Sequence, residues 1–295
     1  MAAQSINTGA SALTGQGDVK SEAAPPRRSV TLRRLGPAFV MIALALATVL
    51  AGGWLFAAMA AVCCVLVFLE WQTMTGVGRT SPTGVLQSST GFAAVGLSAW
   101  GAPDAGLAVV GFGAVAAGIA AAIERKTISH AILGVLYLGL PAIAIIWLRA
   151  LPEVGLVTIL WIYSIVWAGD TAAYGFGRWL GGPKLVPIIS PNKTWSGAIG
   201  GAVASVAAGV AAVLLFSEIG SWSIAILASL AIGIAAQIGD LVESLIKRQL
   251  NVKDSGNLLP GHGGLLDRID SLLGAVTVAF LIYILFAVQG PLWGG

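Results

Sequence analysis

Long apolar segments separated by short polar ones make up most of this chain. After a polar stretch, nine segments follow that contain few charged residues, and most approach the roughly 20 residues that a helix needs to cross a bilayer. We predict helices over 37–52, 54–70, 84–100, 105–123, 128–148, 155–172, 196–216, 222–246 and 271–289. The pattern predicts an all-α, polytopic integral membrane protein with about nine transmembrane helices.

The composition supports this fold class. Hydrophobic residues make up 57% of the 295 residues, charged residues only 10%, and the mean hydropathy is +0.89. A soluble domain carries about 25% charged residues, so a soluble enzyme, a secreted scaffold and a disordered polymer are excluded. The two cysteines, Cys63 and Cys64, are neighbours inside an apolar segment and are interpreted as small buried hydrophobic residues.

The distribution of basic residues predicts the topology. Short loops rich in Lys and Arg stay on the cytoplasmic side of a membrane. With nine helices and a cytoplasmic N-terminus, only Arg149 of the 16 Lys and Arg residues lies outside. Removing the third helix, which carries Gln87, Ser88, Ser89 and Thr90, would divide them seven against nine. Nine helices are therefore favoured, and the loops after the sixth and eighth helices are expected in the cytoplasm.

One group of polar residues lies between positions 240 and 270. Asp240, Glu243, Ser244, Lys247 and Arg248 share one face at the end of the eighth predicted helix. The loop that follows contains Lys253, Asp254, His262 and Gly263-Gly264, and Asp267, Arg268 and Asp270 lie around the start of the ninth helix.

In a purely structural interpretation, this group is a helix end. Its basic side chains reach toward lipid headgroups, and its carboxylates complement a helix dipole. This interpretation leaves the deeper carboxylates, Asp240 and Glu243, unexplained. Carboxylates bind Mg²⁺, and Lys and Arg bind phosphates, so the combination indicates phosphoryl or nucleotidyl transfer.

A second polar group lies around the sixth helix and the loop that follows it. Asp170, Tyr174 and Arg178 are spaced by four residues and share a helix face. Lys184, Ser190, Lys193 and Thr194 follow in the loop. Asp170 could instead form a structural pair with Arg178 or with a neighbouring helix. Because both loops are expected on one side of the membrane, a single site can draw on both.

These two groups resemble the motifs of the phosphatidate cytidylyltransferases, also called CDP-diacylglycerol synthases. The resemblance is strongest from Ser244 to Asp270, which includes Lys253-Asp254-Ser-Gly and Leu-Pro-Gly-His262-Gly-Gly-Leu-Leu-Asp267-Arg-Ile-Asp270. The stretch from Asp170 to Trp195 is similar to the family's second motif. One departure is Ser196, where the family more often has Glu.

The resemblance implies an enzyme that joins CTP and phosphatidic acid into CDP-diacylglycerol and pyrophosphate with Mg²⁺, with a second cation allowed. It implies metal binding by Asp240, Asp267 and Asp270. We assign catalytic roles, chiefly at the CTP phosphates, to Lys247, Arg248, Lys253, Asp254, His262 and Arg268. We assign substrate binding to Asp170, Tyr174, Arg178, Lys184, Ser190, Lys193, Thr194 and Ser244.

The expected organisation follows from the residue pattern, and the homodimer from the resemblance. Residues 1–35 are expected to form a disordered, basic cytoplasmic tail, 36–150 the N-terminal membrane helices, and 151–295 the catalytic membrane region. We expect a homodimer in a bacterial inner membrane, surrounded by lipids, with its active site on the cytoplasmic side and no nucleic acid partner.

Two other functions remain open at this point. A membrane kinase that phosphorylates a polyprenol with CTP would use similar groups on a different lipid. A transporter or channel could place Asp170 and Asp240 along an ion path. A path needs polar groups from one side of the membrane to the other, however, and here they gather at one end.

Overall fold

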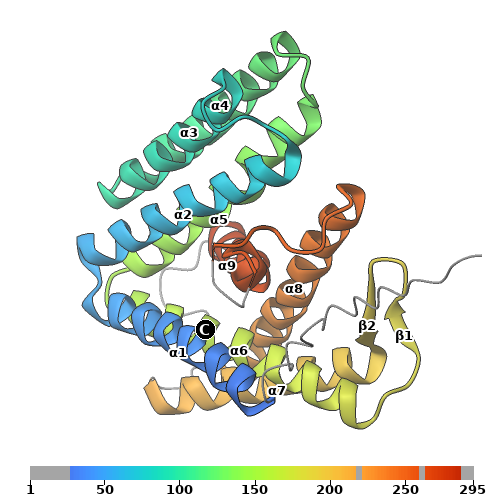
Figure 1. Cartoon of the computed structure of the whole chain (residues 1–295). Coiled ribbons are helices and arrows are strands. Elements are labelled where there is room, and N and C mark those ends of the chain that lie inside the picture. The colour runs from blue at the N-terminus through green and yellow to red at the C-terminus, as the bar shows by residue number, and fades with distance from the viewer. Residues whose placement is uncertain (1–26, 217–220, 259–262, 287–295) are drawn as a thin grey trace, which may run out of the picture.

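The computed structural model describes residues 27–216, 221–258 and 263–286, with side chains from residue 39 onwards. Within these ranges it contains nine helices and one pair of strands (Figure 1). The helices are α1 Arg27–Ala51, α2 Gly53–Thr75, α3 Pro82–Ala99, α4 Pro103–Ile123, α5 Ile128–Ala150, α6 Gly155–Trp179, α7 Trp195–Phe216, α8 Trp222–Gln249 and α9 Leu266–Leu285. The predicted all-α membrane architecture is confirmed.

Seven of the described helices are long and apolar enough to cross a membrane, and α1 and α3 are the other two. Polar residues lower the hydropathy of α3, and several of them, including Gln87 and Thr90, are buried against protein. Gln87 is fully buried, and its Nε2 donates a hydrogen bond of 3.1 Å to the carbonyl oxygen of Ala131 in α5. Thr90 packs against Gly113 of α4. A helix that turns its polar side inward needs less apolar surface to lie in lipid.

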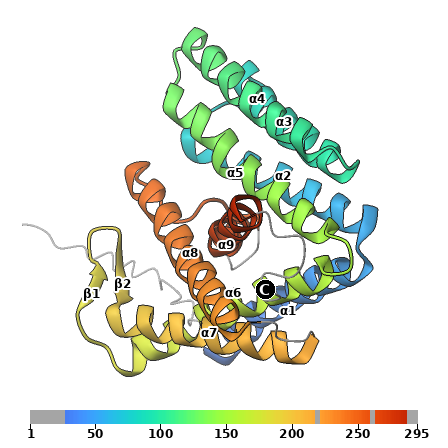
Figure 2. The ribbon, with the colours of Figure 1, turned by 180° about the vertical axis from the view of Figure 1, so that it is seen from behind.

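The helices form two groups with α9 between them. Helices α2 to α5 pack against one another, and α6, α7 and α8 form the second group (Figures 1 and 2). Helix α9 contacts α5 in the first group and α6 and α8 in the second, while α1 contacts α2 and α6. Residues at the start of α9 can therefore meet side chains from both halves of the chain.

A short hairpin, which we did not predict, connects α6 and α7. Strands β1 Lys184–Val186 and β2 Ser190–Thr194 pair antiparallel, with Lys184 opposite Thr194. Gly181 and Gly182, with φ of 62° and 101°, turn the chain into the hairpin. The Arg248 Nε of α8 donates to the carbonyl oxygen of Ile189 at 3.2 Å, so the hairpin is fastened to the end of α8.

Four helix boundaries differ by five or more residues from those we predicted. Helix α1 begins at Arg27, within the expected tail, and residues 1–26 lie outside the described part of the chain. Helix α2 continues to Thr75 and α6 to Trp179, and α9 already begins at Leu266. A helix satisfies its own backbone hydrogen bonds and can extend past its apolar segment. Helix ends predicted from hydropathy alone therefore lie closer to the membrane centre than the ends in the structure.

Helices α8 and α9 touch where both carry glycine. A Cβ on Gly239 would lie 2.6 Å from the carbonyl oxygen of Asp270 and 3.3 Å from the Cα of Gly274. Such a distance is too short for any side chain, so glycine is required for this close approach. The crossing lies beside Asp240 on α8 and Asp270 on α9, and it brings the two carboxylates into one site.

Candidate functional site

A pocket of about 720 Å³ lies between α6, the hairpin, α7, α8 and α9. Eleven of the residues that we predicted as site residues line it: Asp170, Tyr174, Arg178, Lys193, Thr194, Asp240, Lys247, Asp254, Asp267, Arg268 and Asp270. The structure thus brings the two polar groups of the sequence together at one site. We expected this to be possible because both loops were predicted on the same side of the membrane.

Lys193 of the hairpin reaches across the pocket to α8. Its Nζ forms an ion pair of 2.6 Å with Asp240 Oδ2, and the two side chains are 26% and 33% exposed. Ser244, one turn further along α8, donates to the other oxygen, Asp240 Oδ1, at 3.3 Å. The Asp240 carboxylate is therefore oriented by two neighbours and still open to the pocket.

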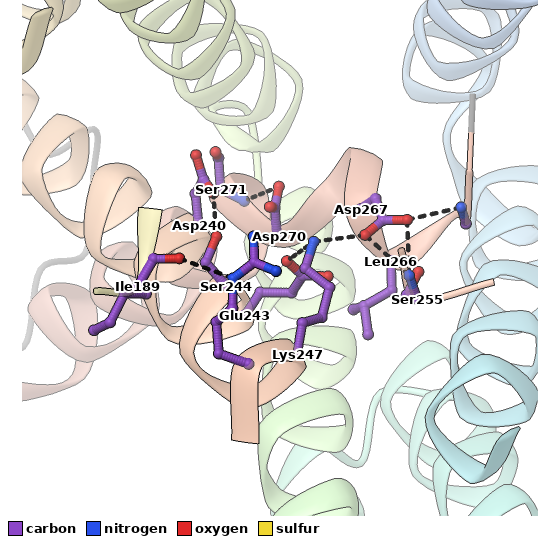
Figure 3. Close-up of polar contacts among 12 residues, drawn as sticks. Ile189, Asp240, Glu243, Ser244, Lys247, Ser255, Leu266, Asp267, Asp270 and Ser271 are labelled. Atoms are coloured by element: carbon purple, nitrogen blue, oxygen red, sulfur yellow. Dashed lines mark hydrogen bonds and ion pairs between the residues drawn. The ribbon is translucent and has the colours of Figure 1, made fainter. Parts of the chain in front are cut away.

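Asp267 is the most heavily hydrogen-bonded carboxylate of the site (Figure 3). It accepts from Lys247 Nζ at 2.7 Å, from the Ser255 backbone N–H at 3.0 Å and from the Gly264 N–H at 2.8 Å. Lys247 also pairs with Glu243, whose side chain is buried. Asp267 therefore fixes the loop that precedes α9 as well as lining the pocket.

Ser271 links Asp170 and Asp270 in the wall of the pocket. Ser271 Oγ donates to Asp170 Oδ1 at 3.3 Å, which links α9 to α6, and the Ser271 N–H donates to Asp270 Oδ1 at 2.8 Å. The negative charges of Asp240, Glu243 and Asp170 all act on Asp270. Like charges gathered in this way repel one another, and a bound cation or a proton relieves the repulsion.

The oxygen ligands of the pocket suit a hard divalent cation. Within the described ranges, no three His, Cys, Asp or Glu side chains are close enough together to hold a metal ion. Mg²⁺ keeps several waters and is commonly bound through only one or two carboxylates and substrate phosphates. Asp240 and Asp270, at the crossing of α8 and α9, are the carboxylates best placed for this, since Asp267 already accepts bonds from Lys247 and the backbone.

The other predicted site residues do not line the pocket. Ser244 and Arg248 contact residues next to it, namely Asp240 and Ile189. Lys184 and Ser190 lie in the hairpin, and Lys253 is exposed in the loop after α8. His262 lies outside the described residues.

Several residues of the site were missing from our predictions, among them Asn192 and Ser271 of the pocket wall. Gln237, one turn before Asp240 on α8, lines the pocket and donates from Nε2 to the Ala198 carbonyl oxygen at 3.1 Å. Glu70 of α2 contacts the loop before α9. A charged residue inside the apolar second segment was the signal that could have drawn attention to Glu70.

An apolar pocket of about 250 Å³ adjoins the polar one. Side chains of α1, α2, α5, α6 and α9 line it, among them Met41, Phe56 and Val276. Asp170 and Arg268 belong to the walls of both pockets. The site therefore has a charged part and an apolar part that meet at one carboxylate and one guanidinium.

The chain matches a known protein family over most of its length. Residues 32–286 match the model of the cytidylyltransferase family, which covers most of the chain and all the described pocket residues. The chain belongs to the cytidylyltransferase family. Both groups of polar residues that we found in the sequence lie within the matched range.

Curated relatives in this family carry a more specific name. The chain is 51% identical over 154 residues to the phosphatidate cytidylyltransferase of Brucella suis biovar 1, which is 52% of this chain and 57% of the relative. It is 39% identical over 155 residues to that of Bacillus subtilis, 52% and 58% of the two chains. The chain thus spans just over half the length of the curated relatives that it matches.

Proposed function

We propose that this protein is a phosphatidate cytidylyltransferase, which converts CTP and phosphatidic acid into CDP-diacylglycerol and pyrophosphate. The observation that carries the proposal is the contact between the charged and apolar pockets at Asp170 and Arg268. A substrate with a phosphate headgroup and acyl chains matches both environments at once. The family and the names of its relatives agree with this choice.

The reaction is a nucleotidyl transfer. An oxygen of the phosphatidate phosphate attacks the α-phosphorus of CTP, a new P–O bond forms, and the bond to the β-phosphate breaks as pyrophosphate leaves. The attacking oxygen is already an anion near neutral pH, so the step needs no general base. The main obstacle is the repulsion between two polyanions, and catalysis consists of positioning and charge neutralisation.

The chain's own cations are arranged for this task. Lys193, Lys247 and Arg268 line the pocket, and both lysines are paired with carboxylates, Lys193 with Asp240 and Lys247 with Asp267. On substrate binding, Lys193 exchanges Asp240 for the lipid phosphate, while Arg268 binds phosphates of CTP at the boundary with the apolar pocket. These pairings hold the lysines in place before the anions arrive.

We propose that Asp240 and Asp270 hold Mg²⁺ together with substrate phosphates, and the proposal allows a second cation. When bound, the ion supplies positive charge to the reacting phosphates. Two features support this assignment. The candidate ligands are carboxylate oxygens, and several other carboxylates lie near Asp270.

We also propose that the site faces the cytoplasm of a bacterial plasma membrane and that the enzyme is a homodimer. The basic loops and the bacterial relatives support the first part. The dimer rests on the family resemblance alone. The mass of the protein in detergent, measured by light scattering, tests it, and a monomer mass would contradict it.

The activity is tested with purified protein, CTP labelled in the cytosine ring and one added lipid at a time. We expect a labelled, organic-soluble product with phosphatidic acid and pyrophosphate release in equal amount. A polyprenol kinase would instead transfer the γ-phosphate, leave the cytosine label in the aqueous phase and release CDP. A transporter would give neither product.

A further inference from the structure

Glu70 is a buried carboxylate far from the signature residues in the sequence, yet it contacts the start of α9. Its side chain is 5% exposed. Its two oxygens accept hydrogen bonds of 2.8 Å each from the backbone N–H groups of Leu265 and Leu266, and Oε2 accepts one of 3.1 Å from Ser255 Oγ. Glu70 therefore joins α2 to the loop and helix that carry the signature.

The contact supplies what the N-terminus of α9 lacks. The first N–H groups of a helix have no partner within the helix, and the side chain of the residue just before the helix often binds one of them. Leu265 precedes α9 and provides no such side chain. The carboxylate of Glu70 binds two of the first N–H groups, those of Leu265 and Leu266, and its negative charge is favourable at the positive end of the helix dipole.

Two glycines leave room for this carboxylate. A Cβ on Gly256 would lie 3.0 Å from Glu70 Oε1, and a Cβ on Gly264 would lie 2.7 Å from Glu70 Oε2. Any side chain at Gly264 would displace Glu70 or Ser255. The loop is therefore shaped around the Glu70 side chain.

Glu70 and Asp267 hold the same segment from two sides. Ser255 donates its hydroxyl to Glu70 and its backbone N–H to Asp267. Gly264 donates its N–H to Asp267, and the next two N–H groups go to Glu70. The direction of the first turns of α9, and with it the position of Asp267, Arg268 and Asp270, depends on both carboxylates.

We infer that Glu70 is a positioning residue for the reaction. It acts through Leu265, Leu266 and Ser255 to place the aspartates at the start of α9, and it is not among the residues that line the polar pocket. This inference rests on the proposed function. It also assigns a task in the reaction to the N-terminal half of the chain.

The test compares Glu70→Gln with Glu124→Gln in the full-length protein. Glu124 is a matched control, because its Oε1 accepts from the Thr83 N–H at 3.1 Å at the start of another helix, α3, away from the pocket. An amide at position 70 keeps the shape of the side chain but loses the charge and sets an NH₂ group against a backbone donor.

We expect Glu70→Gln to lower kcat with phosphatidic acid by at least tenfold, with the KM for CTP changed by less than threefold. The amide hydrogens of Leu265 and Leu266 should exchange faster with deuterium, while those of α8 exchange at the wild-type rate. We expect Glu124→Gln to keep the wild-type kcat. Equal losses in both variants would indicate general destabilisation and would overturn the inference.

A milder variant, Ser255→Ala, removes one hydrogen bond to Glu70 and keeps the N–H that Asp267 accepts. We expect it to lower kcat by two- to fivefold. If Glu70→Gln does not fold, Ser255→Ala tests the inference in its place. A wild-type kcat in Ser255→Ala would then overturn the inference. A wild-type protein that makes no CDP-diacylglycerol would end the proposed function and the inference together. An active wild type with unaffected variants would end the inference alone.

Discussion

The two carboxylates that bind the lysines of the pocket differ in the number of their other hydrogen-bond partners. Asp240 binds Lys193 and the Ser244 hydroxyl and remains partly exposed. Asp267 binds Lys247 and two backbone N–H groups on a loop that it also supports. A carboxylate with few partners can change them when a substrate arrives, whereas one with many partners mainly maintains the structure around it.

The first prediction concerns Asp270 and Asp267. Asp270→Asn and Asp267→Asn should each lower CTP-dependent turnover by about a hundredfold or more, the usual loss when a preorganised charged group is removed. Asp104→Asn, in the exposed first turn of α4, should keep the wild-type rate. Rates of pyrophosphate release, normalised to membrane-inserted protein, test this, and an Asp270→Asn rate equal to that of Asp104→Asn would rule out the metal assignment.

The second prediction separates substrate binding from turnover. Lys193→Gln should raise the KM for phosphatidic acid by about tenfold, because a hydrogen bond to a charged group contributes about 1.5–3 kcal/mol. Lys126→Gln, which alters a Lys bonded to the Gly76 carbonyl oxygen outside the pocket, is the matched control. Initial rates at varied phosphatidic acid provide the KM values. A KM that is unchanged by Lys193→Gln would remove this lysine from the lipid phosphate.

At the scale of helices, the sequence predicted most of the architecture and part of the site. Hydropathy placed all nine helices, and spacing along a helix placed Asp170, Tyr174 and Arg178 on one face. The hairpin was missed because its strands are short and polar. Glu70 was missed because its partners Leu265 and Leu266 lie 195 and 196 residues away, and no local pattern reports such a contact.

The third prediction concerns the crossing of α8 and α9. Gly239→Ala should push the helices apart, because its Cβ would meet the Asp270 carbonyl oxygen. Overpacking of this kind costs about 1–3 kcal/mol. We expect a lower Tm and a lower kcat, since Asp240 and Asp270 lie beside the crossing.

Gly111→Ala in α4 is the control for this variant, because a Cβ there meets nothing within 4 Å. It should leave kcat unchanged and lower neither Tm nor yield. Thermal unfolding in detergent and steady-state kinetics on both variants give the comparison. A Gly239→Ala protein with the wild-type Tm and kcat would contradict the proposed role of the crossing.

Several described loops that the charge count assigns to one side of the membrane contact one another in the fold. Lys126 Nζ bonds the carbonyl oxygen of Gly76, the Thr83 N–H bonds Glu124, and Glu70 near the end of α2 bonds the loop before α9. On the other predicted side, Arg149 Nε donates to the carbonyl oxygen of Val49 at 2.9 Å. These contacts join loops that the charge count assigns to the same side, and the topology itself stays a prediction.

The fourth prediction follows from this topology. Single cysteines at Lys184 in the hairpin and at Asp104 in α4, both exposed positions, should react with a membrane-impermeant maleimide from opposite sides of the membrane. Asp104→Cys should label in intact cells and Lys184→Cys only in inverted vesicles, because cytoplasmic loops are the basic ones. A protein with Cys63 and Cys64 intact and no added cysteine serves as the background. Labelling of Lys184→Cys from outside would place the pocket away from the cytoplasmic CTP, so the proposed activity would have no access to its nucleotide.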